Sequence, residues 1–134
     1  MFGSELWDTS AVVRVLRESR KRPEAVRALA GKQISITVLG ELLLGALLAE
    51  GERERRRVEL VRRVTTLLPQ SERTAEHYAR IVGQLRAGGK QIPTNDIWIA
   101  ASAMEHGLVL RTHDAHFDRV RGLSLVGLDD PKPT

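Results

Sequence analysis

Four acidic residues stand where a carboxylate needs a chemical reason: Asp8, Glu41, Asp96 and Asp114. Glu41 is the clearest case, because residues 38–49 are otherwise only apolar residues and glycine. A buried carboxylate is costly unless a cation or hydrogen-bond donors accompany it. If the four acids meet, their oxygen atoms would bind a hard divalent cation, Mg²⁺ or Mn²⁺ in preference to Zn²⁺.

Such a group of carboxylates repels itself. Two unit charges about 4 Å apart cost about 4 kcal/mol at an effective dielectric constant of about 20. The group must therefore hold protons as a coupled set or bind a cation. A water molecule on a bound divalent ion can attack a phosphodiester, so the chemistry that this pattern favours is metal-assisted hydrolysis.

Each acid also has a simpler interpretation. Asp8 could cap the helix that follows it, Asp96 could be a first-turn acid favoured by the helix dipole, and Asp114 could be a turn residue. A histidine metal site is a further alternative, because two histidines flank Asp114. We favour the acid cluster over that alternative, with His116 as the neighbour of a packing residue, Phe117.

The composition indicates one soluble globular domain, residues 1–134, with a frayed tail at 129–134. The chain has no cysteine, which excludes a thiolate metal site and fits a reducing cytoplasm. No secretory signal is visible, and the apolar run around Glu41 is shorter than the about 20 residues of a membrane span. The net charge of +4 and the pI near 10.1 favour polyanionic partners such as RNA.

The apolar patterns predict strands alternating with helices. We predict strands at residues 5–7, 33–37, 65–68, 108–112 and 123–128. Between them we predict a helix at 11–20, a short one from Pro23 to Gly31, the apolar helix that carries Glu41, an arginine-rich helix at 52–64, a helix capped by Ser71 that reaches Ala87, and a helix that Thr94 caps and Gly107 ends. The helix after Ser71 should bury Ala75, Tyr78, Val82 and Leu85, and the one after Thr94 should bury Ile97, Ala100, Ala101 and Met104.

This alternation predicts a mostly parallel sheet covered on both faces. Right-handed crossovers then place the carboxyl end of every strand along one edge, where open α/β sheets bind ligands. Asp8 follows the first strand, Glu41 lies one turn into the helix after the second, and Asp114 lies just past the strand at 108–112. Asp96 is in the first turn of its helix, so all four acids can reach that edge.

In the residues around these acids, the chain resembles the PIN-domain family, and in particular the VapC-type toxins of bacterial toxin–antitoxin pairs. The segments that carry the resemblance are Leu6-Trp7-Asp8-Thr9-Ser10, the stretch from Ile34 to Leu43, the stretch from Ile92 to Ala103, and His106-Gly107-Leu108 with Thr112-His113-Asp114-Ala115-His116-Phe117. No single segment is specific, but the ordered set of four acids with these neighbours is. Trp7 departs from the pattern, because it is bulkier than the aliphatic residue expected before the first acid.

The resemblance implies a PIN-like three-layer α/β/α fold and a Mg²⁺- or Mn²⁺-dependent endoribonuclease. It implies that the protein is cytoplasmic, forms a homodimer, acts on RNA and is inhibited by a VapB-type antitoxin. It assigns the metal site to Asp8, Glu41, Asp96 and Asp114, with Asp8 and Asp96 as the most direct ligands. Four further residues would orient these carboxylates: Thr9, Ser10, Asn95 and Thr112.

Two other functions remain open at this point. A catalytically idle PIN-like module would bind RNA or a protein partner without cutting, although the intact acid set argues against it. A structure-specific DNA nuclease is disfavoured by the small size of the chain. The arginine-rich helix at 52–64 could contact RNA, antitoxin or only solvent, and the leucines at 42–48 exceed what one core face needs, which favours an interface.

Overall fold

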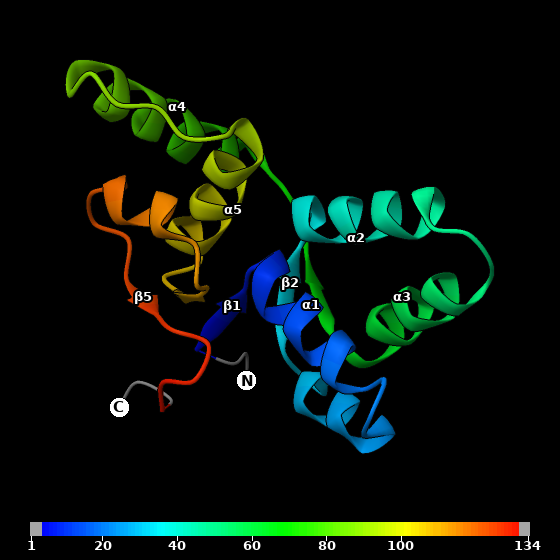
Figure 1. Cartoon of the computed structure of the whole chain (residues 1–134). Helices are drawn as coiled ribbons and strands as arrows, with labels where there is room; N and C mark the ends of the chain where they lie inside the picture. Colours follow the sequence, from blue (N-terminus) through cyan, green and yellow to red (C-terminus); the bar gives the residue numbers. More distant parts are fainter. Residues whose placement is uncertain (1–3, 132–134) are drawn as a thin grey trace.

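The computed structural model describes residues 4–131, and strands alternate with helices throughout this range (Figure 1). In chain order the elements are β1 (Glu5–Trp7), α1 (Thr9–Glu18), the 3₁₀ helix η1 (Pro23–Leu29), β2 (Gln33–Ser35), α2 (Ile36–Leu48), α3 (Arg53–Val64), β3 (Thr66–Leu68), α4 (Glu72–Ala87), α5 (Thr94–Glu105), β4 (Val109–Arg111), the 3₁₀ helix η2 (Ala115–Arg119) and β5 (Leu125–Val126).

The strands form one five-stranded sheet in the order β3-β2-β1-β4-β5, and every neighbouring pair is parallel. The chain moves outward from β1 to β3 and then crosses to the other side of β1 for β4 and β5. Right-handed crossovers therefore place α1, α2 and α3 on one face and α4, α5 and η2 on the other. Figure 1 shows these two groups of helices on opposite sides of β1. The predicted three-layer α/β/α fold with a parallel sheet is confirmed.

Several element boundaries differ from the prediction because caps decide them. The predicted strand at 33–37 ends at Ser35, whose hydroxyl oxygen accepts a hydrogen bond from the Val38 amide (3.2 Å) and so starts α2 early. The predicted cap of α5 is also wrong: Pro93, in an extended conformation, precedes the helix, and Thr94 is its first residue. Ser71 does cap α4, in a reciprocal capping box with Thr74.

The two last strands and α1 differ by a few residues from the predicted ranges. The strands predicted at 108–112 and 123–128 are shorter, as β4 and β5, and α1 begins two residues before position 11, directly after Asp8. These shifts leave the order of the elements unchanged. They also place the first helix immediately beside the first acid.

The inner face of α4 is turned slightly from the predicted one. Thr74, Ile81 and Leu85 are buried, whereas Ala75 is exposed. Thr74 takes the inner position because its hydroxyl donates a short hydrogen bond to Glu105 at the end of α5. The buried residues of α5 are Ile97, Ile99, Ala100, Ala101, Ser102 and Ala103, so this helix lies inside the core, and the predicted Met104 is only half-buried.

A buried ion pair lies beneath the carboxyl edge of the sheet. Arg111 on β4 donates to both carboxylate oxygens of Glu5 on β1, at 2.9 and 2.7 Å. The Trp7 indole donates to Glu5 (3.2 Å), and the Arg111 guanidinium lies 5.7 Å from the centre of the Trp7 ring. The bulky Trp7 therefore packs as part of this pair, and its side chain does not crowd the strand.

The chain after β5 is held in place as far as the structure describes it. The Arg111 guanidinium donates to the carbonyl oxygens of Gly127, Leu128 and Asp130, at 2.8 to 3.1 Å. Asp129 forms an ion pair with Arg14 at 2.9 Å. Residues 129 and 130 make these contacts, residues 132–134 lie outside the described range, and the fraying of the tail stays a prediction.

The helices α2 and α3 present very different surfaces. Leu44 is 55% exposed, and Leu47 and Leu48 are each 75% exposed, so α2 does carry more leucine than the core uses. On α3, Arg57 and Arg62 pair with glutamates of the same helix. Glu54 also pairs with Arg20, which lies two residues past the end of α1. Over the described residues, no helix has the length and apolar character that crossing a membrane requires.

Candidate active site

The ends of β1 and β4 lie side by side, and each is followed by a predicted site residue. The Asp8 amide donates to the Arg111 carbonyl oxygen (3.0 Å), which continues the pairing of the two strands. The Thr112 hydroxyl donates to Oδ2 of Asp8 (2.7 Å). Because β1 leads to a helix on one face and β4 to a helix on the other, this point is the topological switch point of the sheet, where open α/β sheets bind ligands.

Asp8 is almost fully buried, at 4% exposed, and two hydroxyls converge on one of its oxygens. The Ser10 hydroxyl donates to Oδ2 (3.0 Å), beside the bond from Thr112. Asp8 occupies the N-cap position of α1, but its side chain makes no capping hydrogen bond. The simpler interpretation of Asp8 as a helix cap therefore fails, and no hydrogen bond from the described residues occupies Oδ1.

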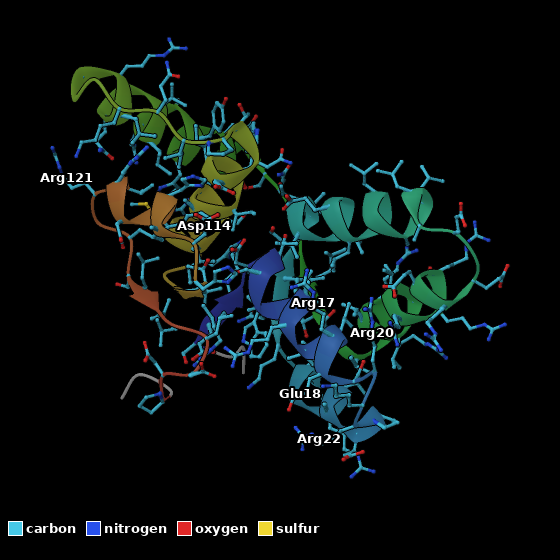
Figure 2. The ribbon with its side chains drawn as sticks, viewed as in Figure 1. Arg17, Glu18, Arg20, Arg22, Asp114 and Arg121 are labelled. Carbon is cyan, nitrogen blue, oxygen red and sulfur yellow. The ribbon has the colours of Figure 1, made fainter. Side chains whose placement is uncertain are left out.

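A second acidic pair forms where α5 begins and β4 ends. Asp96, in the first turn of α5, and Asp114, which precedes η2, both contact the same imidazole. Nδ1 of His116 lies 3.0 Å from Oδ2 of Asp96 and 3.0 Å from Oδ1 of Asp114. Figure 2 labels Asp114 where η2 begins, beside α5. The three side chains form a compact group with donor atoms within 4.8 Å of one another.

The causes of the pKa shift of Asp96 connect Asp8 with the group of Asp96, Asp114 and His116. Burial raises the pKa of Asp96, and the hydrogen bond with His116 opposes that rise. The negative charges of Asp114 and Asp8 raise the pKa further. Asp8 and Asp96 therefore lie near enough to repel each other, although they come from elements on opposite sides of the sheet.

Glu41 is connected to α1 through Thr9. Its Oε1 accepts a hydrogen bond from the Thr9 hydroxyl (2.7 Å), and Thr9 directly follows Asp8. Glu41 is half-buried, and it does not belong to the compact group of Asp96, Asp114 and His116. The carboxylate that looked least explicable in the sequence thus has a neutral hydrogen-bond donor as its partner.

The predicted orienting residues divide into two groups. Thr112 and Ser10 bind Asp8, and Thr9 binds Glu41. Asn95 is exposed, and in the described part of the chain no hydrogen bond joins its side chain to an acid. It lies in the first turn of α5 next to Asp96, so the helix holds Asp96 without needing the Asn95 amide.

His116 belongs to the site, although the sequence favours the acid cluster over a histidine metal site and makes His116 the neighbour of Phe117. Its ring contacts two of the four acids. The signal was present in the His-Asp-x-His order of residues 113–116. Asp114 also behaves as a turn residue, because its Oδ1 accepts from the His116 amide (3.0 Å) and caps η2. The capping role and the site role therefore belong to the same carboxylate.

The chemistry of these donors fits a hard divalent cation. Three aspartates and a glutamate provide oxygen atoms, and Asp96 is destabilised as an anion by burial and by its acidic neighbours. A cation would remove that repulsion. Among the described residues, Asp96 and Asp114 are the carboxylates that the structure groups within reach of one ion, and hard divalent cations prefer such ligands.

The parallel sheet and the acids at its carboxyl edge define an α/β protein with a candidate metal site. Residues 6–123, most of the chain, match the PIN domain family. The chain belongs to the PIN domain family.

Among characterised proteins, the chain is similar to Ribonuclease VapC4 of Mycobacterium tuberculosis, at 39% identity over 84 residues, which are 60% of this chain and 65% of that protein. It is also similar to Ribonuclease VapC1 of Rickettsia felis, at 36% identity, over 69% of this chain and 73% of that protein. A crystal structure from Mycobacterium tuberculosis, of VapBC-5 from the VapBC family of toxin–antitoxin systems, superposes with a TM-score of 0.69. Its identity is 27%, and the match covers 93% of this chain and 98% of that chain. The predicted family resemblance is confirmed.

Proposed function

We propose that this protein is a divalent-metal-dependent endoribonuclease that acts as the toxin of a toxin–antitoxin pair. The observation that carries the proposal is the convergence of Asp96 and Asp114 with Asp8 nearby, at the carboxyl edge of the sheet. The names of the related ribonucleases support RNA as the substrate. The net charge of +4 favours a polyanionic substrate.

In the proposed mechanism the protein positions groups and supplies no nucleophile. A bound Mg²⁺ or Mn²⁺ would generate hydroxide from water at neutral pH and neutralise charge on the phosphoryl oxygens. Asp96 and Asp114 would hold the ion together with Asp8, whose Oδ2 is fixed by hydrogen bonds from Thr112 and Ser10. Glu41 is the fourth acid, and Thr9 sets the direction of its carboxylate.

The proposed partners are RNA, a VapB-type antitoxin and a second copy of the chain. The toxin–antitoxin origin of the structural relative supports an antitoxin. The exposed leucines of α2 support a protein interface, and an antitoxin or a second copy could cover them. The cytoplasmic location that the sequence indicated stays a prediction.

The proposal is tested with purified protein and end-labelled single-stranded RNA, incubated with Mg²⁺, with Mn²⁺ or with chelator. We expect cleavage only with a divalent ion, and a loss of at least about 100-fold in Asp96→Asn, because the variant lacks one anionic ligand. Retained RNA binding in Asp96→Asn would show that the fold is intact. RNA binding without cleavage under every metal condition would support the idle module instead.

A single-stranded DNA and a branched DNA substrate of matched length belong in the same assay. Selective cleavage of RNA supports the proposal. Selective cleavage of branched DNA would support the structure-specific DNA nuclease and would contradict it.

A further inference from the structure

His116 makes contacts that an all-carboxylate metal site does not need. Its Nδ1 atom lies 3.0 Å from Oδ2 of Asp96 and also 3.0 Å from Oδ1 of Asp114. The imidazole therefore lies between the two acids that form the compact part of the site. One N–H bond can be well aligned with only one of these oxygens, so a simple hydrogen bond accounts for one contact more readily than for both.

The local fold fixes the position of this ring. The Asp114 side chain caps η2 by accepting from the His116 amide (3.0 Å), and the Asp114 amide donates to the Thr112 hydroxyl (3.0 Å). Phe117, the next residue, is fully buried, with 0% exposure. The capping hydrogen bond to the His116 amide and the buried Phe117 that follows hold the backbone at His116 in place. His113 on the same loop is exposed, and its ring makes no contact with these acids among the described residues.

The distances match those between ligands of one metal ion. Neighbouring ligand atoms around an octahedral ion with bonds of about 2.1 Å are about 3.0 Å apart. Both contacts of Nδ1 have this length, and the donor atoms of the three residues lie within 4.8 Å of one another. The two contacts of Nδ1 thus have the length of two edges of a coordination sphere.

We propose that His116 is a direct metal ligand through Nδ1, and that this nitrogen makes the site favour transition-metal ions such as Mn²⁺ over Mg²⁺. Imidazole nitrogen suits first-row transition ions, whereas Mg²⁺ prefers oxygen ligands and gives up its water reluctantly. The inference rests on the proposed metal-dependent function, because it concerns the same site. It adds a ligand and a selectivity that the four acids alone do not provide.

The test measures metal binding and does not depend on RNA cleavage. Mn²⁺ and Mg²⁺ affinities are measured by calorimetry on the full chain and on His116→Ala, His116→Asp and the control His113→Ala. Pulsed electron paramagnetic resonance of bound Mn²⁺ reports whether a nitrogen atom is directly coordinated. Thermal unfolding with chelator confirms that each variant is folded.

We expect a directly bound nitrogen in the wild-type protein and in His113→Ala, and none in either His116 variant. His116→Ala should weaken Mn²⁺ binding by about tenfold or more, since even partners outside the first ligand sphere are worth about 10- to 100-fold. His116→Asp, which restores an all-oxygen set, should bind Mg²⁺ at least as tightly as the wild type and lower the preference for Mn²⁺ by about tenfold or more.

Two results would overturn the inference, and they differ in whether the proposed metal-dependent function is also contradicted. Mn²⁺ that binds through the acids with no nitrogen signal, and with the same affinity in His116→Ala, would make His116 a hydrogen-bond partner only. The metal-dependent function would then survive. A failure of the wild-type chain to bind either ion would contradict both the inference and the proposed function.

Discussion

A single hydroxyl connects two of the acidic residues of the site: Oγ1 of Thr112 donates to Oδ2 of Asp8 (2.7 Å) and accepts from the backbone amide of Asp114 (3.0 Å). The residue after β4 therefore orients the acid after β1 and also fixes the start of the segment that carries Asp114. This link depends on the parallel pairing of β1 with β4, in which Trp7 lies opposite Arg111.

Thr112→Val tests this link, because valine keeps the shape of threonine and removes the hydroxyl. Oδ2 of Asp8 would lose one of its two donors, and the Asp114 amide would lose its acceptor. We expect RNA cleavage to fall by about 10- to 100-fold, the usual effect of removing a partner that orients a metal ligand. Steady-state cleavage assays check this, and Thr112→Ser should retain most of the activity. Equal losses in both variants would assign Thr112 to packing.

Asp96→Asn should make the metal-free protein more stable while it abolishes cleavage. Burial raises the pKa of Asp96, and the charges of Asp114 and Asp8 raise it further, so its anion destabilises the folded state at neutral pH. Removing that charge should raise Tm in chelator by a few degrees. Differential scanning calorimetry measures the shift. A lower Tm would mean that the Asp96 carboxylate stabilises the fold through His116, and that repulsion from Asp114 and Asp8 does not dominate.

The Glu5–Arg111 pair should make stability depend on acidity. The hydrogen bond from Arg111 holds the pKa of Glu5 below its usual range, even though burial acts in the opposite direction. Because the folded pKa is lowered, the stabilisation is complete above the unfolded value and is lost as the pH falls through the folded value. Denaturant unfolding at pH 7 should show Glu5→Gln to be less stable by about 3 kcal/mol.

That difference should narrow as the pH is lowered below about 4.5, the range in which an unfolded glutamate takes up its proton. Lys32→Gln is the comparison variant, because its ammonium makes no ion pair with a described residue and its charge lowers the pKa of Glu5 less than the hydrogen bond from Arg111 does. A Glu5→Gln deficit that stays constant down to pH 4 would show that the charge of Glu5 contributes nothing.

The exposed leucines of α2 should matter for association and not for folding. Leu47→Ser and Leu48→Ser alter side chains that are 75% exposed, so the free energy of unfolding should change by less than about 0.5 kcal/mol. Light scattering of the protein alone should show weaker self-association, or calorimetry with the proposed antitoxin should show weaker binding. Leu67→Ser on β3, where the leucine is 43% exposed, is the control. Unchanged mass and unchanged affinity would leave this face without a partner.

The sequence predicted the order of elements well because the cues are local. The β-branched residues at 34–37 indicate a strand, and the apolar spacing from Ile97 onward indicates a helix. Acids directly after strands lie at one edge of any parallel sheet. It did not predict where α2 begins or which residue precedes α5, because a serine can end a strand or cap a helix, and only the flanking backbone decides.

Local sequence patterns also did not predict which residues the His116 ring contacts. Its ring contacts Asp96, which lies 20 positions earlier in the chain, and only the docking of η2 against α5 brings the two together. The hydrogen bond between Glu41 and Thr9 depends in the same way on how α2 packs against α1. Sequence position predicted which acids share an edge, and tertiary packing determined which of them touch.

The central claim, that Asp8, Asp96 and Asp114 share one divalent ion, is tested most directly by anomalous X-ray scattering from crystals grown with Mn²⁺. The account predicts an anomalous peak within about 2.5 Å of carboxylate oxygens from all three residues. It also predicts that the peak is absent from crystals of Asp96→Asn grown under the same conditions. Active wild-type protein whose Mn²⁺ lies elsewhere, or whose peak persists unchanged in Asp96→Asn, would contradict it.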